Sequence, residues 1–207
     1  MRFLNNMKFV LASSNKNKIK ELLAILSDVL GDDIEVITMK DAGITEEIIE
    51  DGSTFAENAL IKARVAAKTG MIGIGDDSGL TVDALDGAPG IFSARYAGEH
   101  GNDELNNQKL LFEMKDKTDR SASFVCCIAC VFPDGRESII THGYIHGEIL
   151  HAPRGNNGFG YDPLFYSKEL GKTLAEADSN EKNLVSHRSN ALKAFAEAFK
   201  KALQNTL

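Results

Sequence analysis

Near its start, the chain places a short apolar run directly before a lysine-rich helical pattern, and this order most constrains how it can fold. The run at residues 9–12 has strand character, and Ser13, Ser14 and Asn15 suit a turn that caps a helix. A helix that Gly31 closes is indicated by the spacing of Ile19, Leu22, Leu23, Leu26 and Leu30. The segment therefore predicts a strand, a polar turn and a helix, the repeating unit of α/β folds.

Lys16, Lys18 and Lys20 lie in the first turns of this predicted helix. Positive charges there oppose the helix dipole, and each costs about 0.3–1 kcal/mol if nothing offsets it. A bound anion would offset them, and phosphate is the obvious candidate because helix N-termini bind phosphate. The alternative is a lysine-bearing helix face exposed to solvent, and this segment alone leaves both interpretations open.

The rest of the chain alternates predicted strands and helices. Strands are predicted at residues 34–38, 72–75 and 80–85 and on both sides of a hairpin turn at 133–135. Helices are predicted at 54–68, 103–116 and about 192–203, and loops at 41–52, 87–90 and 154–160. Thr54 and Glu57 have the spacing of a capping box. This order predicts one α/β domain, residues 1–207, with a mixed sheet.

Composition limits the possible partners. A chain of 207 residues with 43% hydrophobic and 26% charged residues is ordinary for one folded domain. The net charge of −7 opposes binding to duplex DNA, whereas a small phosphorylated ligand needs only a local basic pocket. The sequence contains no membrane-span or secretory pattern, and Cys126, Cys127 and Cys130 fit core thiols in a reducing cytosol. We expect a cytoplasmic protein that binds neither nucleic acid nor membrane.

Asp76 and Asp77 follow the apolar residues 72–75, at the predicted carboxyl end of a strand, where ligands collect in open α/β sheets. Neighbouring carboxylates repel each other unless they share a cation, and Mg²⁺ binds through one or two carboxylates plus substrate phosphates. An aspartate there could also deprotonate water. The alternative is a turn at the end of the strand, stabilised by aspartate side-chain hydrogen bonds.

Two further segments carry chemistry. Phe159 and Tyr161 interrupt a glycine-rich loop, and an aromatic ring there could stack on a nucleobase for about 1–3 kcal/mol. Alternatively, both rings anchor the loop to the core. His187 and Arg188 precede the last predicted helix, where they could contact a base or a phosphate, with Lys182 adding a charge. A surface capping turn is the alternative for this segment.

Five segments together resemble one family, the inosine triphosphate pyrophosphatases, also described as non-canonical purine nucleoside triphosphate pyrophosphatases. They are, in order, VLASSNKNKIKE, EDGSTFAENALIKA, DDSGLTVDALDGAPGIFSARYAG, GFGYDP and SHRSNAL. GFGYDP and the run from DDSGL to APGIFSARYAG are the most specific, and the resemblance extends through nearly the whole chain.

The resemblance implies a two-lobed α/β fold with a long mixed central sheet flanked by helices and an active-site cleft between the lobes. It also implies a homodimer and dependence on Mg²⁺. Members hydrolyse ITP, dITP and XTP to the nucleoside monophosphate and pyrophosphate, which removes deaminated purines from the nucleotide pool.

The resemblance also assigns residues to the phosphates and the metal. The phosphate loop corresponds to Ser13, Ser14, Asn15, Lys16, Asn17 and Lys18. Asp77 corresponds to the carboxylate that binds the metal and accepts a proton, and Ser78 to the adjacent substrate contact. Lys62 corresponds to a lysine near the phosphates, although its local sequence alone indicates an ordinary exposed helix position.

The base-holding loop corresponds to Phe159, Gly160, Tyr161 and Asp162, and the remaining nucleotide contacts to Lys182, His187 and Arg188. The chain departs from the family at a second metal-binding glutamate that some members place before the glycine preceding the second helix. Alignment puts Ile49 opposite that glutamate, with Glu50 as the possible substitute.

Two other functions remain open at the level of sequence. One is a pyrophosphatase that acts on other nucleotides, such as modified pyrimidine triphosphates, with the same phosphate and metal residues. The other is a regulatory module that binds a nucleotide without turnover, against which Asp77 and the lysine loop argue.

Overall fold

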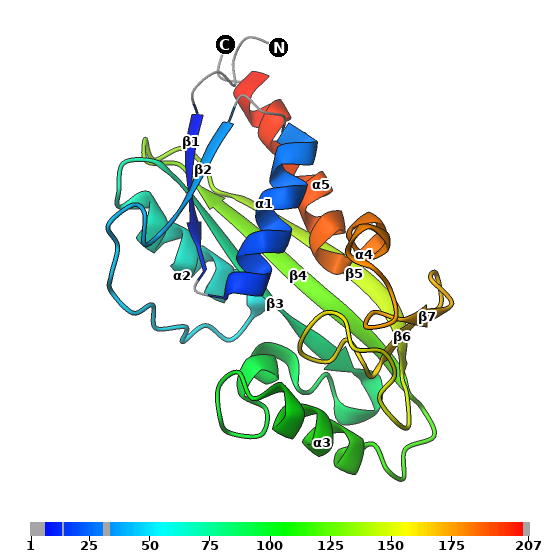
Figure 1. Cartoon of the computed structure of the whole chain (residues 1–207). Helices are drawn as coiled ribbons and strands as arrows, with labels where there is room; N and C mark the ends of the chain where they lie inside the picture. The colour runs from blue at the N-terminus through cyan, green and yellow to red at the C-terminus, as the bar shows by residue number, and fades with distance from the viewer. Residues whose placement is uncertain (1–6, 14, 31–33, 205–207) are drawn as a thin grey trace. The chain divides into compact units, whose positions relative to one another are not determined.

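The computed structural model describes residues 7–13, 15–30 and 34–204. Its strands are β1 (Met7–Ala12), β2 (Ile34–Thr38), β3 (Ile72–Val82), β4 (Ser121–Val131), β5 (Ile139–Ile149), β6 (Phe165–Ser167) and β7 (Lys172–Thr173). Its α-helices are α1 (Lys16–Leu30), α2 (Phe55–Ala67), α3 (Asp103–Glu113), α4 (Ser179–Val185) and α5 (His187–Gln204) (Figure 1). Two 3-10 helices, η1 (Asp83–Leu85) and η2 (Gly90–Arg95), follow β3.

Within the described residues, the strands form one mixed sheet of seven strands in the order β2-β1-β3-β4-β5-β6-β7. β1 pairs in parallel with both β2 and β3, whereas β6 pairs antiparallel with β5 and β7. The predicted α/β class with a mixed sheet flanked by helices is therefore confirmed. None of the helices in the described ranges is both long and apolar enough to cross a membrane.

The chain divides into two compact units, which we describe separately. Unit 1 comprises residues 1–77, 126–143 and 188–207, and unit 2 comprises residues 78–125 and 144–187. The chain passes from one unit to the other within β3, β4 and β5 and at the start of α5. Whether the chain behaves as a single domain, as its sequence predicts, stays a prediction.

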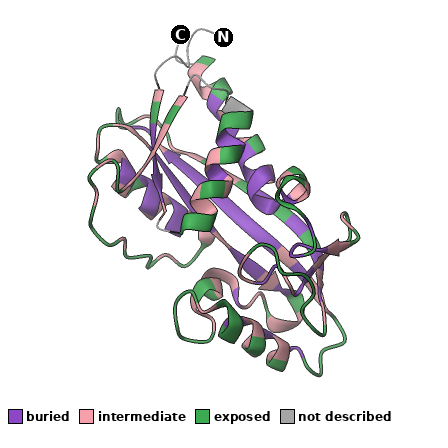
Figure 2. Cartoon of the chain, in the orientation of Figure 1, coloured by how far each residue is buried: buried purple, intermediate pink, exposed green. Residues whose placement is uncertain are grey.

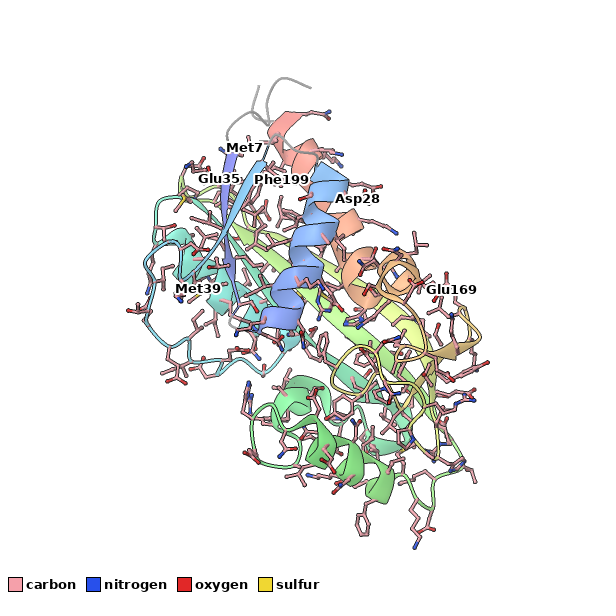
Figure 3. The ribbon with its side chains drawn as sticks, in the orientation of Figure 1. Met7, Asp28, Glu35, Met39, Glu169 and Phe199 are labelled. Carbon is pink, nitrogen blue, oxygen red and sulfur yellow. The ribbon has the colours of Figure 1, made fainter. Side chains whose placement is uncertain are left out.

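Unit 1 packs helices on both faces of its strands. Phe9 and Leu11 of β1 belong to a core cluster with residues of α1 and α5, whereas Val10 and Ala12 cluster with Ala66 of α2. Alternate residues of a strand point to opposite faces, so α1 and α5 cover one face and α2 covers the other. α1 and α5 lie side by side (Figure 1), and Phe199 of α5, labelled in Figure 3, packs its ring 5.4 Å from that of Phe9. Figure 2 shows β1, β3 and β4 as largely buried.

α2 lies unusually close to β3 because two glycines of the strand leave room for it. A Cβ atom added at Gly73 would lie 2.1 Å from the carbonyl oxygen of Ala63, and one added at Gly75 would lie 2.1 Å from that of Ala59. Real Cβ atoms essentially never come this close to a backbone oxygen. The two glycines therefore set the distance at which α2 presents its side chains to β3.

Unit 2 has its own core. Leu80 and Val82 of β3 pack with Phe124 of β4 and Phe165 of β6, and the rings of the two phenylalanines lie 4.8 Å apart. Leu110 of α3 and other buried side chains complete this cluster.

The structure corrects several expected element boundaries. β3 runs without a break from Ile72 to Val82, whereas the sequence predicted two strands separated by a turn at residues 76–79. Asp76, Asp77 and Ser78 are of residue types that are common in turns. Here they lie within a strand, and both aspartates are buried. The short elements β6, β7 and α4 were not predicted, and the expected helix end at Gly31 lies outside the described residues.

Candidate active site

In unit 1, Asn15 caps α1, as its sequence predicts. Its Oδ1 accepts the backbone N–H groups of Asn17 and Lys18 at 3.0 and 3.1 Å, and Ser13 Oγ accepts the N–H of Asn15 at 3.3 Å. Asn15, Lys16 and Asn17 are exposed. Ser14, also assigned to the phosphate loop, lies outside the described residues. The polar turn and the helix start expected for a phosphate loop are therefore present.

Lys18 already has an anion within the chain. Its Nζ lies 2.9 Å from Oδ1 of Asp76, whose side chain is fully buried. Asp76 therefore offsets the charge of Lys18 at this helix start without an external anion. Lys16 and Lys20 are exposed, and a bound anion would offset their charges at the helix start.

Asp76 is the centre of a buried network on the α1 and α5 face of β3. Its Oδ2 accepts Arg188 Nε at 3.2 Å and the thiol of Cys126 at 3.0 Å, and Arg188 Nη1 also pairs with Glu21 of α1. Burial raises the pKa of Asp76, but Lys18 and Arg188 outweigh burial and hold it well below its ordinary value. With two cations and two carboxylates, this network is electrically balanced.

Asp77 points to the opposite face of β3, toward α2. Lys62 Nζ lies 2.8 Å from Asp77 Oδ1 and 2.8 Å from Glu50 Oε2, and Asn58 Nδ2 lies 3.4 Å from Asp77 Oδ2. Lys62 is only 6% exposed, so the local prediction of an exposed helix position was wrong. Asp76 and Asp77 pair with different cationic side chains, because consecutive strand residues face opposite ways.

The Glu50–Lys62–Asp77 group fits a divalent cation by its donor chemistry. One ammonium and two carboxylates give it a net charge of −1, and both carboxylates converge on a single cationic atom. Mg²⁺ is bound by one or two carboxylates together with substrate phosphates, so Asp77 and Glu50 would be the residues to hold it. Glu50 brings the second carboxylate here through its 2.8 Å contact with Lys62, whereas Ile49 is 75% exposed. Across residues 7–13, 15–30 and 34–204, no cluster of three or more His, Cys, Asp or Glu side chains is arranged to hold a metal by itself.

Burial also sets the protonation of this group. It raises the pKa of the Asp77 carboxyl above its ordinary value, and Lys62 opposes part of that shift. Lys62 is itself buried, yet Asp77 and Glu50 together outweigh burial and raise the pKa of its ammonium. Lys62 therefore remains protonated, and Asp77 has the higher basicity that a proton acceptor requires.

In unit 2, Asp162 organises the expected base-holding loop. Its Oδ2 accepts the N–H of Phe159 at 3.0 Å and Lys182 Nζ at 2.7 Å, and both Asp162 and Lys182 are buried. Lys182 Nζ also lies 4.8 Å from the centre of the Phe159 ring. The structure thus brings Phe159, Asp162 and Lys182 together, with the Phe159 ring only half-buried.

Tyr161 differs from Phe159, because its ring is 4% exposed and belongs to the core of unit 2. Its hydroxyl donates to the carbonyl oxygen of Ser93 at 2.8 Å. Of the two rings considered for stacking, Tyr161 is thus the core anchor and Phe159 is the ring that remains accessible. Gly160 between them has φ +61°, a conformation that favours glycine.

His187 and Arg188 are adjacent in sequence but contribute to different units. The His187 ring stacks on Phe124 within unit 2, with centroids 4.9 Å apart, whereas Arg188 is fixed in the Asp76 network of unit 1. Ser78, the other predicted contact in unit 2, lies half-buried within β3. The alternative of a surface capping turn is wrong, because Ser186, His187 and Arg188 are all buried. Ser186 ends α4, and its N–H donates to the carbonyl oxygen of Lys182 at 2.9 Å.

Sequence reasoning did not find several residues that hold these groups, namely Glu21, Asn58, Asp103, Asn107 and Cys126. Asn58 had a usable signal, because it lies four residues before Lys62 and therefore on the same face of a helix. The others contact partners far along the chain, and no local spacing identifies them.

Comparison with known proteins identifies the family of this chain. The Ham1 family model matches residues 9–198. The dITP/XTP pyrophosphatase of Clostridium perfringens (strain 13 / Type A) is 48% identical over 206 residues, covering 95% of this chain and 99% of that protein. The dITP/XTP pyrophosphatase of Geobacter sulfurreducens is 49% identical over 188 residues, covering 89% and 92% respectively.

Solved structures agree with this assignment. A HAM1 protein from Coxiella burnetii matches with a TM-score of 0.85 and 45% identity, covering 94% of this chain and 99% of that chain. The Ham1 protein of Staphylococcus aureus matches with a TM-score of 0.84 and 42% identity over the same shares. Since the family model spans most of the sequence and relatives of nearly half identity align over almost their whole length, the chain belongs to the Ham1 family.

Proposed function

We propose that the protein hydrolyses ITP, dITP and XTP to the nucleoside monophosphate and pyrophosphate, and so removes deaminated purines from the nucleotide pool. The observation that carries this proposal is the buried Asp77 carboxylate, held by Lys62 beside Glu50 in a Ham1-family chain. Curated relatives of nearly half identity are named dITP/XTP pyrophosphatases, which supports both the bond and the bases.

The groups of unit 1 act on the triphosphate. The turn of Ser13 to Lys18 and the exposed Lys16 bind phosphate oxygens, and Lys62 adds a protonated ammonium. Asp77 and Glu50 would hold Mg²⁺, which when bound supplies positive charge against the phosphates. Asp77 orients a water molecule and accepts its proton. The water oxygen forms a bond to the α phosphorus, the bond from that phosphorus to the bridging oxygen breaks, and pyrophosphate leaves with the electron pair.

The remaining residues that the resemblance assigns act on the base, and all of them except Arg188 belong to unit 2. The accessible Phe159 ring stacks on the purine, with Lys182 and Asp162 fixing it. A donor from His187 or Arg188 bonds the C6 carbonyl of hypoxanthine or xanthine. Adenine has an amino group at C6, so such a donor would stay unpaired and ATP would be disfavoured. Because Arg188 already pairs with Asp76 and Glu21, His187 is the first of the two to test.

We further propose that the protein is cytoplasmic, that its chain forms a single domain and that its active form is a homodimer. The homodimer is proposed from the family resemblance. Sedimentation equilibrium of the purified protein tests the dimer directly, and a monomer at micromolar concentration would contradict it.

The test of function is a substrate panel with product identification. The purified chain is incubated with Mg²⁺ and, separately, ITP, XTP, dITP, GTP, ATP and dTTP, and pyrophosphate is distinguished from orthophosphate. We expect pyrophosphate, with a strong preference for ITP, XTP and dITP. Orthophosphate would assign another bond, a pyrimidine preference would assign another house-cleaning substrate, and tight ITP binding without product would indicate a sensor.

A further inference from the structure

Both backbone groups of Gly160 are held by side chains of α3. The Gly160 N–H donates to Asp103 Oδ2 at 2.7 Å, and Asn107 Nδ2 donates to the Gly160 carbonyl oxygen at 2.9 Å. Asp103 is the first residue of α3 and Asn107 lies four residues later, so both side chains lie on one face of the helix. All of these residues belong to unit 2.

Gly160 is the point at which the loop of residues 159–162 most needs an external support. As a glycine it can adopt a wide range of backbone conformations, its φ is +61°, and a Cβ atom added there would contact nothing within 4 Å. The neighbouring residues are held by other hydrogen bonds, because Asp162 accepts from the Phe159 N–H and the Tyr161 hydroxyl donates to the Ser93 carbonyl oxygen. The two α3 side chains thus fix the peptide groups between the accessible ring of Phe159 and the buried ring of Tyr161.

The side chain of Asn107 carries a cost in folding free energy, and this cost points to a role in holding Gly160. Its Oδ1 is buried, and no hydrogen-bond partner for that atom lies among the described residues. A buried acceptor without a partner destabilises a fold, so an apolar side chain would suit position 107 better on stability grounds. The amide keeps its donor on Gly160, which is the contact that an apolar side chain would lose.

We propose that Asp103 and Asn107 are positioning residues that hold the base-holding loop in the conformation needed to select the nucleobase. The proposal rests on the proposed function, because it takes Phe159 as the ring that stacks on the purine. Asp103 and Asn107 act through Gly160, and the groups assigned to the triphosphate lie in unit 1. Loss of either hydrogen bond should therefore weaken base binding and base discrimination while leaving the rate of the bound substrate unchanged.

The test compares four variants of the full chain. Asn107→Leu removes the donor, Asp103→Ala removes the acceptor, and Asp103→Asn keeps an oxygen that can accept from Gly160. Glu104→Ala is the matched control, because Glu104 is exposed in the same turn of α3 and its side chain accepts from Gln108 instead of the loop. The kcat and KM for ITP and ATP are measured with Mg²⁺, together with Tm and with ITP and ATP affinities by calorimetry without metal.

For Asn107→Leu and Asp103→Ala we expect KM for ITP to rise about 3–10-fold, the equivalent of one hydrogen bond. The ratio of kcat/KM for ITP over ATP should fall with it, at unchanged kcat. Asp103→Asn and Glu104→Ala should behave as the wild type. Asn107→Leu removes the Asn107 Oδ1, which has no partner among the described residues, but also takes the donor away from the Gly160 carbonyl oxygen, so Tm should change little while base selection falls.

If the wild type is active and Asn107→Leu and Asp103→Ala keep its selectivity for ITP over ATP, the positioning role is overturned. A loss of selectivity that follows Tm and is not rescued by Asp103→Asn would overturn it too, since it would mark general destabilisation. If the wild type hydrolyses no triphosphate, the proposed function fails separately. The calorimetric ratio of ITP to ATP affinity then decides the loop proposal, and a wild type that binds neither nucleotide, or variants with the wild-type ratio, would contradict it.

Discussion

Asp76 and Asp77 show how two consecutive identical residues acquire different chemistry. Asp76 is balanced by Lys18 and Arg188 in a buried network, whereas Asp77 shares one lysine with Glu50 and so retains a negative excess. The alternation of a strand places these carboxylates on opposite faces. At the scale of single residues, Asp76 therefore supports the structure and Asp77 is the candidate for catalysis.

Replacing Asp77 with Asn should abolish most turnover while leaving the fold intact. The amide cannot accept the proton of water or bind a cation as a carboxylate does, and general base catalysis alone contributes about 10²–10⁴-fold. Activity with ITP and Tm are the two measurements, and Asp51→Asn, an exposed acidic residue next to Glu50, is the control. Near-normal turnover in a folded Asp77→Asn variant would remove Asp77 from the mechanism.

Replacing Asp76 with Asn should instead destabilise the fold by about 3–5 kcal/mol, because Arg188 and Lys18 would lose a buried carboxylate. The difference in unfolding free energy between the wild type and Asp76→Asn should depend on pH. The pKa of Asp76 in the folded chain lies well below its ordinary value of 3.8, so between those values the unfolded chain binds more protons and stability rises with pH.

The contribution of Asp76 is therefore fully present above about pH 4 and is lost as the pH falls through the folded pKa. Urea unfolding of the wild type and Asp76→Asn at pH 7 and pH 3 measures this change. The gap in unfolding free energy between the two proteins should narrow at pH 3, and a gap of equal size at both pH values would show that Asp76 is not held ionised by its partners.

At the scale of elements, the packing of α2 on β3 connects the fold to the site. α2 carries Asn58 and Lys62, and both reach Asp77 because Gly73 and Gly75 let the helix lie close to the strand. Most elements with a strong period could be predicted from sequence, including β1, α1, β2, α2 and the β4–β5 hairpin. The continuity of β3 could not, because its polar residues are acceptable in a strand only when partners on other elements neutralise them.

Gly75→Ala should separate α2 from β3, since the added Cβ would meet the Ala59 carbonyl oxygen at 2.1 Å and the Ala63 nitrogen at 2.8 Å. We expect a lower Tm and a loss of ITP turnover larger than the loss of stability explains, because Lys62 moves away from Asp77. Gly70→Ala is the control. Its Cβ would meet nothing, and its φ of +79° costs about 1–2 kcal/mol of strain. Equal activity losses in both variants would contradict the special role of Gly75.

At the scale of the whole molecule, three strands contribute residues to both units. If either unit unfolded alone, its own portions of β3, β4 and β5 would be lost, and the other unit would keep only the remaining portions of these strands. The sequence supplies separate probes for the two units. All four tyrosines, Tyr96, Tyr144, Tyr161 and Tyr166, lie in unit 2, whereas the three cysteines, Cys126, Cys127 and Cys130, lie in unit 1 and are buried.

We expect both probes to report a single unfolding transition in urea. Tyrosine fluorescence follows unit 2, and brief labelling with a thiol reagent follows unit 1. Burial raises the pKa of Cys127 and Cys130 to about 12, which further suppresses labelling of the folded chain. Coincident midpoints would support a single cooperative domain, and midpoints that differ by more than the experimental error would mean that the two units unfold independently.

The sequence by itself determined what depends on neighbouring residues: the periodic helices and strands, the Asn15 cap of α1, and the ordered motifs that place the chain in its family. The tertiary structure alone decided the contacts between distant residues. It turned Lys62 inward, selected Glu50 over Ile49, separated Asp76 from Asp77, and paired Arg188 with Asp76 across 112 positions of sequence. The reason is physical, because spacing along the chain fixes local geometry, whereas burial and ion pairing depend on which surfaces pack together.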